Sequence, residues 1–349
     1  MILLGVLLPS FMAGIRYDVG GDYASYLKMY NNVVNGRQMY FRSIEPLSAG
    51  IINFSAHIQS SFTMFFIFNL ITNICFVVAF KILCKGDNNR TAQTYFIYLC
   101  ILYPASLFVM RSSISASVLM ISFALLMRKW NLKTVIASIV LILIAFMFHR
   151  TAALAFLFLP IFYFSEKFTR KKNSSKKMLL ILALYIIGML MVPTIYKGLN
   201  GIVRFGDYDR YLTTIGESFS IPLANVLMFT PIIYAFACIF KRKSEYDTQL
   251  AKLAYCSTSY IAISVLVGWL TLVGVPALSR LSIMLEPLVI CLMAYQVGTI
   301  KNLKGKSKMV ASICMAMIIC MMLVRNLNWS ISLPYKTIFQ QDISYAPGH

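Results

Sequence analysis

Acidic residues are scarce in this chain, and basic residues outnumber them. Only 12 of its 349 residues are aspartate or glutamate, against 32 lysines and arginines, and histidine occurs three times. Charged residues make up 13% of the sequence, whereas about 25% is usual for a soluble globular domain. With 59% apolar residues and a mean hydropathy of +0.74, the composition excludes a soluble domain and is typical of a membrane protein.

Motifs that identify several enzyme classes are also missing. The sequence has no Gly-x-x-x-x-Gly-Lys-Ser/Thr, so ATP-driven chemistry is not indicated, and no His-Glu-x-x-His, so an intramembrane zinc protease is not indicated either. The eight cysteines form no Cys-x-x-Cys pair and lie in or beside apolar runs, so we interpret them as small buried apolar residues. We therefore expect neither a metal site nor a cofactor.

Apolar runs recur along the chain, and each is long enough for a helix that crosses a hydrocarbon core about 30 Å thick. The runs at 92–127 and 134–165 are too long for one crossing and carry charge at their centres, Arg111 in the first and His149-Arg150 in the second, so we predict a hairpin in each. The other predicted spans are 1–15, 62–83, 178–196, 222–240, 253–273, 281–298 and 309–324. The pattern predicts an all-α polytopic integral membrane protein with about 11 transmembrane helices (range about 10–12), and residues 1–349 as a single transmembrane domain.

Two polar segments, 16–60 and 197–221, are expected to be the main outer loops. The first contains a semi-apolar piece, 46–58, which we expect to lie along the interface or to re-enter. If this piece crossed fully, the chain would have one more span and the first loop would change sides. Residues 1–15 have no basic start and no cleavage site before a soluble domain, so we interpret them as a short first span and not as a signal peptide.

The basic residues are concentrated in alternate loops. Nineteen of the 32 lysines and arginines lie in the loops 85–90, 128–133, 166–177, 241–252 and 301–308, together with four acidic residues. This distribution predicts that these loops are cytoplasmic, and it explains the net charge of +20 without nucleic-acid binding. The intervening loops then lie on the outer side of the membrane.

Most of the remaining polar groups map to that outer side: Arg16, Asp18, Asp22, Glu45, Arg111, His149, Arg150, Arg204, Asp207, Arg210 and Arg280. A single arginine at a span end is usually an interface anchor, but several arginines on one side indicate an anionic partner. A guanidinium group binds two oxygens of a diphosphate at once, through two parallel N–H donors. His149 is either a hydrogen-bonded interface residue or a general base, with Asp18, Asp22 and Glu45 as competing bases. The tyrosines in the same two segments, Tyr23, Tyr26, Tyr208 and Tyr211, either stack on sugars or form an interfacial belt.

The stretch Arg16-Tyr-Asp-Val-Gly-Gly-Asp-Tyr-x-x-Tyr resembles the opening outer loop of the EpsG-type family of polysaccharide polymerases, which usually reads Arg-x-x-Val-Gly-Thr-Asp-Tyr-x-x-Tyr. Further segments resemble the family in the same order: Glu45-Pro46-Leu47, Met110-Arg111, Phe148-His149-Arg150-Thr151-Ala152, and the arginine-tyrosine pattern of 204–211. The chain departs from the family pattern at Gly21, Ser112 and Thr151, where threonine, glutamine and serine are usual.

This resemblance implies the Wzy functional class, with an architecture similar to the GT-C membrane glycosyltransferases. Such enzymes join oligosaccharide repeat units carried on undecaprenyl diphosphate, at the outer face of the bacterial cytoplasmic membrane, in O-antigen, lipopolysaccharide or capsule synthesis. The implied partners are the lipid-linked donor and acceptor, membrane lipids, a chain-length regulator and a flippase, and no nucleic acid. No metal or cofactor is implied.

The site residues follow from the resemblance and the outer-face map together. The catalytic candidates are His149, Asp22, Asp18 and Glu45, and the substrate-binding candidates are Arg16, Arg111, Arg204, Arg210, Arg280, Tyr23, Tyr208 and Tyr211. Three other functions stay open: a lipid-linked oligosaccharide flippase or other transporter, a membrane acyltransferase acting on polysaccharide, and a structural subunit. A transporter needs polar groups at mid-depth, and Glu286 is the one carboxylate expected within a span.

Overall fold

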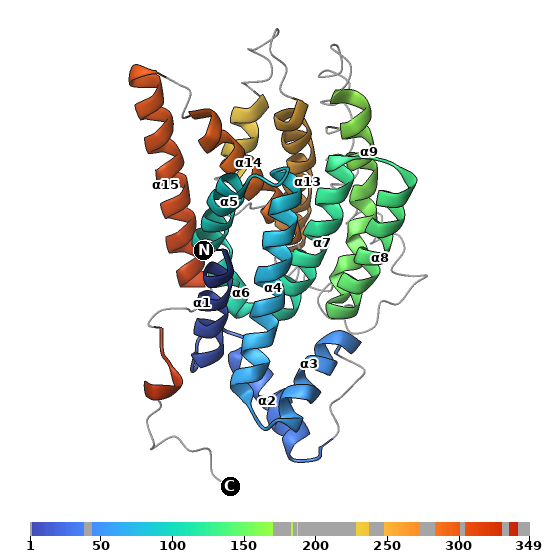
Figure 1. The fold of residues 1–349 in the computed structure, drawn as a ribbon, viewed down its shortest axis with the longest axis vertical. Helices are drawn as coiled ribbons and strands as arrows, with labels where there is room; N and C mark the ends of the chain where they lie inside the picture. Colours follow the sequence, from blue (N-terminus) through green and yellow to red (C-terminus); the bar gives the residue numbers. More distant parts are fainter. Residues whose placement is uncertain are drawn as a thin grey trace. The chain divides into compact units, whose positions relative to one another are not determined.

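The computed structural model describes residues 2–37, 44–169, 183, 187, 228–236, 248–271, 283–300, 304–329 and 335–340. This part of the chain is helical and contains no strand, and its one β-type contact is an isolated antiparallel bridge between Arg16 and Thr337. The α-helices of the described residues are α1 (Ile2–Ile15), α2 (Tyr23–Val34), α3 (Pro46–His57), α4 (Ser61–Leu83), α5 (Asn88–Ile101), α6 (Tyr103–Phe108), α7 (Met110–Arg128), α8 (Leu132–Phe148), α9 (Ala155–Thr169), α13 (Thr248–Thr271), α14 (Glu286–Ile300) and α15 (Gly305–Trp329) (Figure 1). The predicted helical class is confirmed for these residues, and the number of spans stays a prediction.

The chain divides into two compact units. Unit 1 comprises residues 1–124, 136–153 and 319–349, and unit 2 comprises residues 125–135 and 154–318. Helices α1 to α6 belong to unit 1, and α9, α13 and α14 belong to unit 2. That the two units act as a single transmembrane domain stays a prediction.

Two asparagines fix the rotation of α4 inside unit 1. The Asn73 amide donates to Ser10 Oγ of α1 over 2.9 Å, and its oxygen accepts from the Tyr98 hydroxyl of α5 over 3.1 Å. One turn earlier, Asn69 Oδ1 accepts from the Ser106 hydroxyl of α6 over 3.3 Å. A buried polar group without a hydrogen-bond partner lowers the stability of the fold. These bonds therefore determine which face of the otherwise apolar α4 packs against α1, α5 and α6.

Serines hold α7 against α8. The Ser115 hydroxyl donates to the Ala145 carbonyl oxygen over 3.0 Å, and Ser122 and Ser138 donate to each other's carbonyl oxygens over 3.4 and 3.2 Å. Ser115, early in α7, contacts Ala145 late in α8, whereas Ser122, later in α7, contacts Ser138 earlier in α8. The two helices therefore run antiparallel. Small side chains at such contacts let two apolar helices approach closely.

Both predicted hairpins have their turns where the central charges stand. The run 92–127 is interrupted at Val109, where φ is −115° and ψ is 63°, and Arg111 is the second residue of the helix that follows. The run 134–165 is interrupted at His149, between α8 and the short 3₁₀ helix Arg150–Leu154. Figure 1 shows the beginning of α7 and the end of α8 at the same end of unit 1 as α2 and α3.

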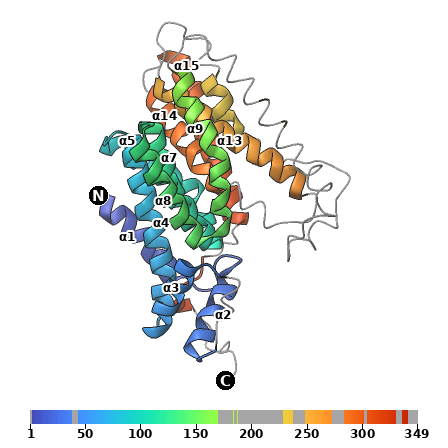
Figure 2. The same cartoon turned by 90° about the vertical axis from the view of Figure 1, so that its right-hand side faces the viewer.

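The first polar segment contains two helices and is more regular than expected. We predicted a polar loop after Arg16, but α2 forms there because Tyr23, Tyr26 and Tyr30 recur at helical spacing and are buried. The semi-apolar piece 46–58 forms α3, whose 12 residues span only about 18 Å. This length does not cross a bilayer, and Figure 2 shows α3 beside the beginning of α4 together with α2.

In unit 2, polar side chains also link the helices. The Lys252 ammonium of α13 forms an ion pair with Glu166 of α9 and donates to the Met127 carbonyl oxygen over 3.3 Å. The Gln296 amide of α14 donates to the Pro231 carbonyl oxygen over 2.6 Å. All seven described cysteines are free thiols, but the prediction that they are buried is wrong for Cys314 and Cys320, which are exposed on α15.

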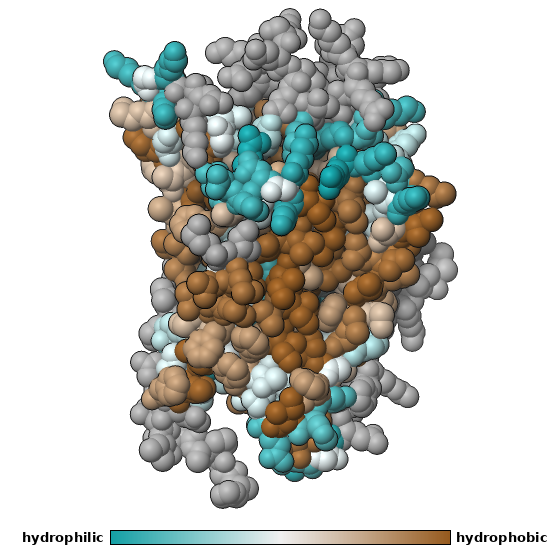
Figure 3. All heavy atoms as spheres, in the orientation of Figure 1, coloured by the Kyte–Doolittle hydropathy of each residue, from teal (hydrophilic) through white to brown (hydrophobic). Residues whose placement is uncertain are grey.

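Several helices expose apolar side chains to their surroundings. Among the described residues, α4 and α7 are long enough to cross a membrane and contain windows with mean hydropathies of 2.1 and 1.6, and four other apolar helices are shorter. On α8 the residues Ile136, Val140 and Leu143 are exposed at helical spacing whereas Ser138 is buried, which is the reverse of a soluble helix. Figure 3 shows apolar side chains along the middle of α4, between polar groups of the 85–90 loop and of α2. Exposed apolar faces of this kind are typical of contact with lipid.

Candidate functional site

The first loop, residues 16–22, packs against the segment that precedes α7. Gly20 has a φ of +94°, and a Cβ atom there would lie 2.7 Å from the Leu107 carbonyl oxygen. A Cβ atom on Gly21 would lie 2.0 Å from the Phe108 ring. The glycine pair therefore supplies both the left-handed turn and the room for the loop backbone to lie directly on residues 107 and 108.

Arg16 is fully buried beneath this loop. Its guanidinium donates to the Leu107 carbonyl oxygen over 2.6 Å, lies 3.0 Å from the Met110 sulfur and covers the Phe65 ring at 4.5 Å from its centre. Burial lowers the pKa of Arg16 from 12.5 to about 10, so the side chain is still charged at neutral pH. A guanidinium with 0% exposure is enclosed by protein, and these contacts fix the loop to the residue next to Arg111.

Residues 335–340, which we name the C-terminal strap, lie against the same loop. The Tyr17 amide donates to the Lys336 carbonyl oxygen over 2.9 Å, beside the Arg16–Thr337 bridge. The Tyr335 hydroxyl donates to the Met12 carbonyl oxygen at the end of α1. Burial raises the pKa of Tyr335 to about 12. The Tyr335 ring packs on a small apolar cluster formed by Ala13, Val19 and Leu107.

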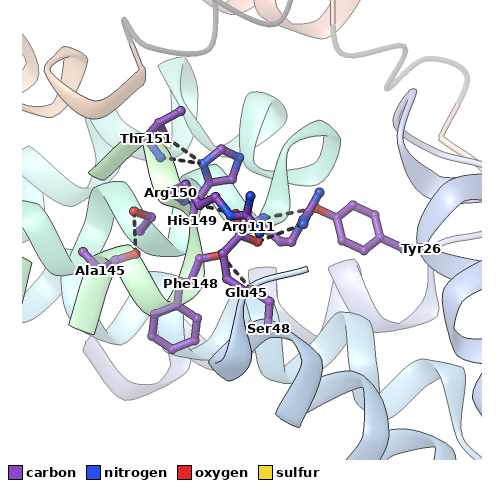
Figure 4. A network of polar contacts seen from close by, with 10 residues as sticks. Tyr26, Glu45, Ser48, Arg111, Ala145, Phe148, His149, Arg150 and Thr151 are labelled. Carbon is purple, nitrogen blue, oxygen red and sulfur yellow. Dashed lines mark hydrogen bonds and ion pairs between the residues drawn. The ribbon is translucent and has the colours of Figure 1, made fainter. Parts of the chain in front are cut away.

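Glu45 connects two further elements of unit 1. Pro46 begins α3 and favours an extended backbone before it, and Glu45 accordingly has φ −71° and ψ 148°. Its side chain does not cap α3. One carboxylate oxygen accepts from the Arg111 guanidinium over 2.9 Å, and the other accepts from the Arg150 backbone N–H over 3.1 Å. Glu45 thus ties the start of α7 to the turn after α8 (Figure 4).

Arg111 is held from its other side by α2. The Tyr26 hydroxyl accepts from the Arg111 backbone N–H over 3.2 Å, and the guanidinium lies 5.9 Å from the centre of the Tyr26 ring. Figure 4 shows Arg111 between Tyr26 and Glu45. The Arg111 side chain is 19% exposed, and its Nε has no hydrogen-bond partner. This Nε is buried, so a further oxyanion would reach the guanidinium through the exposed part of the side chain.

His149 lies in the turn between α8 and the 3₁₀ helix. The Thr151 backbone N–H donates to His149 Nδ1 over 3.3 Å, and the Thr151 hydroxyl lies 2.7 Å from the same nitrogen. Because Nδ1 accepts a hydrogen bond, the neutral imidazole carries its proton on Nε2. The Ser48 hydroxyl of α3 steadies this turn by donating to the Phe148 carbonyl oxygen over 2.9 Å. His149 is therefore arranged to donate a hydrogen bond from Nε2.

The family profile of the EpsG family matches residues 1–337. The chain belongs to the EpsG family. The matched region includes the first loop, the Glu45–Arg111 pair, the His149 turn and the residue that bridges to Arg16 from the C-terminal strap. No curated protein and no solved structure matches the chain significantly.

In this EpsG-family chain, the structure brings part of the predicted site together. Glu45, Arg111 and the His149 turn adjoin one another, and Asp22 is half-buried at the start of α2. Asp18 is exposed, with a φ of +51°. The remaining substrate candidates Arg204, Tyr208, Arg210, Tyr211 and Arg280 lie outside the described residues.

Two substrate-binding candidates of the EpsG-family motif are enclosed by protein. Arg16 is buried as described above, and Tyr23 is 6% exposed with its ring stacked on Phe65 at a centre distance of 4.9 Å. In this conformation both side chains pack beneath the first loop and do not face solvent. Their contact with substrate stays a prediction.

Sequence reasoning missed several residues that orient the EpsG-family site. Tyr26, the last tyrosine of the first motif, positions Arg111 through its hydroxyl, and Ser48, one turn after Glu45, steadies the His149 turn. Thr151 beside His149 was noted only as a departure from the family pattern. The C-terminal strap had no signal, because its pairing with the first loop joins opposite ends of the chain.

Proposed function

We propose that this chain is a membrane glycosyltransferase that polymerises polysaccharide by joining oligosaccharide repeat units carried on undecaprenyl diphosphate. The observation that carries the proposal is the cluster of Arg111, Glu45 and the His149 turn, in which groups from α3, α7 and the end of α8 meet. Membership of the EpsG family supports a polysaccharide polymerase. The exposed apolar faces of α4 and α8 support a location in a membrane, where a lipid-linked substrate is found.

Each group of the cluster has a distinct proposed role. Arg111 binds the donor diphosphate, because a guanidinium offers two parallel donors to phosphate oxygens. His149 donates from Nε2 to an oxygen of the bound sugars or diphosphate, and so positions them. A carboxylate, with Asp22, Glu45 and Asp18 as the candidates, accepts the proton of the acceptor hydroxyl.

The bonds of this transfer balance without a further reactant. The acceptor oxygen forms a bond to the anomeric carbon of the donor sugar, and the bond from that carbon to the diphosphate oxygen breaks. The hydroxyl proton passes to the carboxylate, and the electron pair leaves with the diphosphate, whose growing charge the guanidinium of Arg111 stabilises.

We place the site on the outer face of the bacterial cytoplasmic membrane, in a GT-C-like bundle of about 11 spans. Within unit 1 the cluster lies near the beginning of α4, and the basic loop 85–90 follows the end of α4. The 23 residues of α4 span about 35 Å, enough to separate the two sides of a bilayer. Nucleotide sugars are absent outside the cell, which favours a lipid diphosphate as the donor.

The test uses the purified full chain and a lipid-diphosphate-linked oligosaccharide, without nucleotide sugar. We expect a ladder of longer products that EDTA does not abolish, because arginines are proposed to take the place of a divalent cation. The chelator arm matters because Asp207 and Asp209 form an Asp-x-Asp pair outside the described residues. A ladder restored only by added magnesium or manganese would contradict metal independence.

Two variants connect the assay to the cluster. Arg111→Ala should lower elongation by at least about a hundredfold, the usual effect of removing a group that stabilises developing charge. Arg90→Ala is the matched control, since Arg90 is exposed and its ion pair with Asp87 measures 3.5 Å. A normal ladder from the Arg111 variant would remove Arg111 from the site. Movement of the substrate across vesicles without elongation would instead identify a flippase.

A further inference from the structure

We infer that Glu45 is the resident counterion of Arg111 and that the donor diphosphate displaces its carboxylate from the guanidinium during binding. The inference rests on the proposed function, because it describes how the same site takes up its anion. The structural basis is the direct pairing of Arg111 with a nearly buried carboxylate that belongs to a different helix.

The ion pair leaves little net charge on Arg111 and Glu45 taken together. Glu45 Oε2 lies 2.9 Å from Arg111 Nη1, and the two side chains are 6% and 19% exposed. At such low exposure a charge is poorly screened, so a diphosphate that approached the intact pair would be repelled by the carboxylate as well as attracted by the guanidinium. Tight binding therefore requires the Glu45 carboxylate to leave the guanidinium.

The surroundings allow this exchange without moving Arg111. The Arg111 backbone N–H is bonded to the Tyr26 hydroxyl, which fixes the start of α7 independently of Glu45. The second Glu45 oxygen is bonded to the Arg150 backbone N–H, so the carboxylate has a neutral donor to which it stays attached. A diphosphate offers the guanidinium several oxygens in place of the one Glu45 oxygen that contacts it here.

A resident counterion also provides selectivity. An anion displaces Glu45 only if its charge and its number of oxygens exceed those of a carboxylate. A single phosphate or a sulfate competes poorly, whereas a diphosphate presents several oxygens to the guanidinium. Glu45 would then exclude the abundant small anions of the outer medium from a site built for a lipid diphosphate.

The experiment is a titration of the full chain in detergent with inorganic pyrophosphate and, separately, with inorganic phosphate. Glu45→Gln removes the negative charge and keeps an oxygen for the Arg150 N–H, so it should bind pyrophosphate about tenfold more tightly and also bind phosphate. Glu45→Asp keeps the charge and should not tighten binding. Glu166→Gln is the matched control, because Glu166 pairs with Lys252 at similar exposure in unit 2, and its pyrophosphate affinity should equal that of the wild type.

The wild-type chain provides a second measurement that does not depend on a substitution. A carbodiimide and a small amine label exposed carboxylates, and mass spectrometry measures the labelling at Glu45. Added pyrophosphate should increase it, because Glu45 loses its guanidinium partner. Unchanged or reduced labelling, or unchanged affinity in Glu45→Gln, contradicts the exchange. If the wild type binds pyrophosphate and Arg111→Ala does not, the proposed diphosphate site survives that result; if neither binds, both ideas fail.

Discussion

At the scale of single residues, each reactive side chain of the cluster is oriented by a neutral neighbour. Tyr26 fixes the backbone of Arg111, and Thr151 fixes the ring of His149 through Nδ1. Such second contacts set the direction in which a charged or titratable group faces, and losing the corresponding contacts to metal ligands commonly costs tenfold to hundredfold in the activity of metalloenzymes. The sequence alone indicated that Arg111 and His149 are candidate site residues. The structure shows which neighbouring groups orient their side chains.

Substitution of Thr151 tests this orientation. Thr151→Val removes the hydroxyl beside Nδ1 and should lower kcat about tenfold with little change in KM, because His149 loses part of its restraint. Thr151→Ser keeps the hydroxyl and should retain the wild-type rate. His149→Ala should lower kcat by about a hundredfold. The measurement is elongation kinetics, with the thermal melting temperature recorded alongside.

The comparison of valine with serine separates orientation from folding. If Thr151→Val lowers the melting temperature as much as the rate, the residue supports only the fold. If it leaves kcat unchanged, the Thr151 hydroxyl does not restrain the His149 ring, and the backbone N–H to Nδ1 is sufficient.

At the scale of elements, two short segments hold the first loop in place. Helix α2 presents Tyr23 to Phe65 of α4 and Tyr26 to Arg111 of α7. On the other side, the C-terminal strap pairs with Tyr17 and reaches the end of α1 through Tyr335. The loop that carries the family's opening motif is therefore clamped between an early helix and the last described segment of the chain.

Tyr335→Phe tests the strap. The change removes the hydrogen bond to the Met12 carbonyl oxygen and should destabilise unit 1 by about 1 kcal/mol at pH 8. Burial raises the pKa of Tyr335 from 10.0 to about 12, so the stability gained from its proton is present below pH 10 and is lost as the pH rises to 12. The difference in melting temperature between wild type and variant should therefore shrink above pH 10.

Phe339→Ala is the control within the same strap, because Phe339 is 81% exposed. Its melting temperature should equal that of the wild type. A pH-independent difference for Tyr335→Phe would show that the phenol proton does not contribute, and an equal loss in both variants would show a general effect of the strap.

The elements were predictable to the extent that their signal was local. The lengths of the apolar runs and the charges at their centres located the breaks near Arg111 and His149. Helix α2 was missed because its buried face consists of tyrosines in a polar stretch and not of aliphatic residues. The strap was missed because backbone pairing between Arg16 and Thr337 depends on the tertiary fold and leaves no periodic pattern.

The same limit applies to the candidate site. That Glu45, Arg111 and His149 lie at one end of unit 1 was predicted from their places at the ends of the predicted spans. The hydrogen bonds of Glu45 to Arg111 and to the backbone of Arg150 could not be predicted, because side-chain partners depend on how α3 lies against α7 and α8. For the same reason Arg16, which looked like a ligand group, is enclosed by Phe65 and residues 107–110.

At the scale of the whole molecule, the proposal depends on which side of the membrane the cluster faces. Within unit 1 the first loop and α2 lie near the beginning of α4, and the basic loop 85–90 lies at its other end. Basic loops stay in the cytoplasm, so the first loop should face outward. An outward site meets lipid diphosphates, and an inward site would meet nucleotide sugars, so sidedness decides the class of donor.

Cysteine labelling in intact cells measures this sidedness. In a chain whose eight native cysteines are replaced, Asp18→Cys and Lys28→Cys should react with a membrane-impermeant maleimide, because both positions are exposed in or next to the first loop. Asn89→Cys is equally exposed but belongs to the basic loop, so it should react only after the membrane is permeabilised. The three positions are read against one another in the same background, so differences in expression do not affect the comparison. The opposite pattern would place the Arg111 cluster in the cytoplasm, where the donor would have to be a nucleotide sugar, and a polymerase acting on outward-facing lipid diphosphates would be excluded.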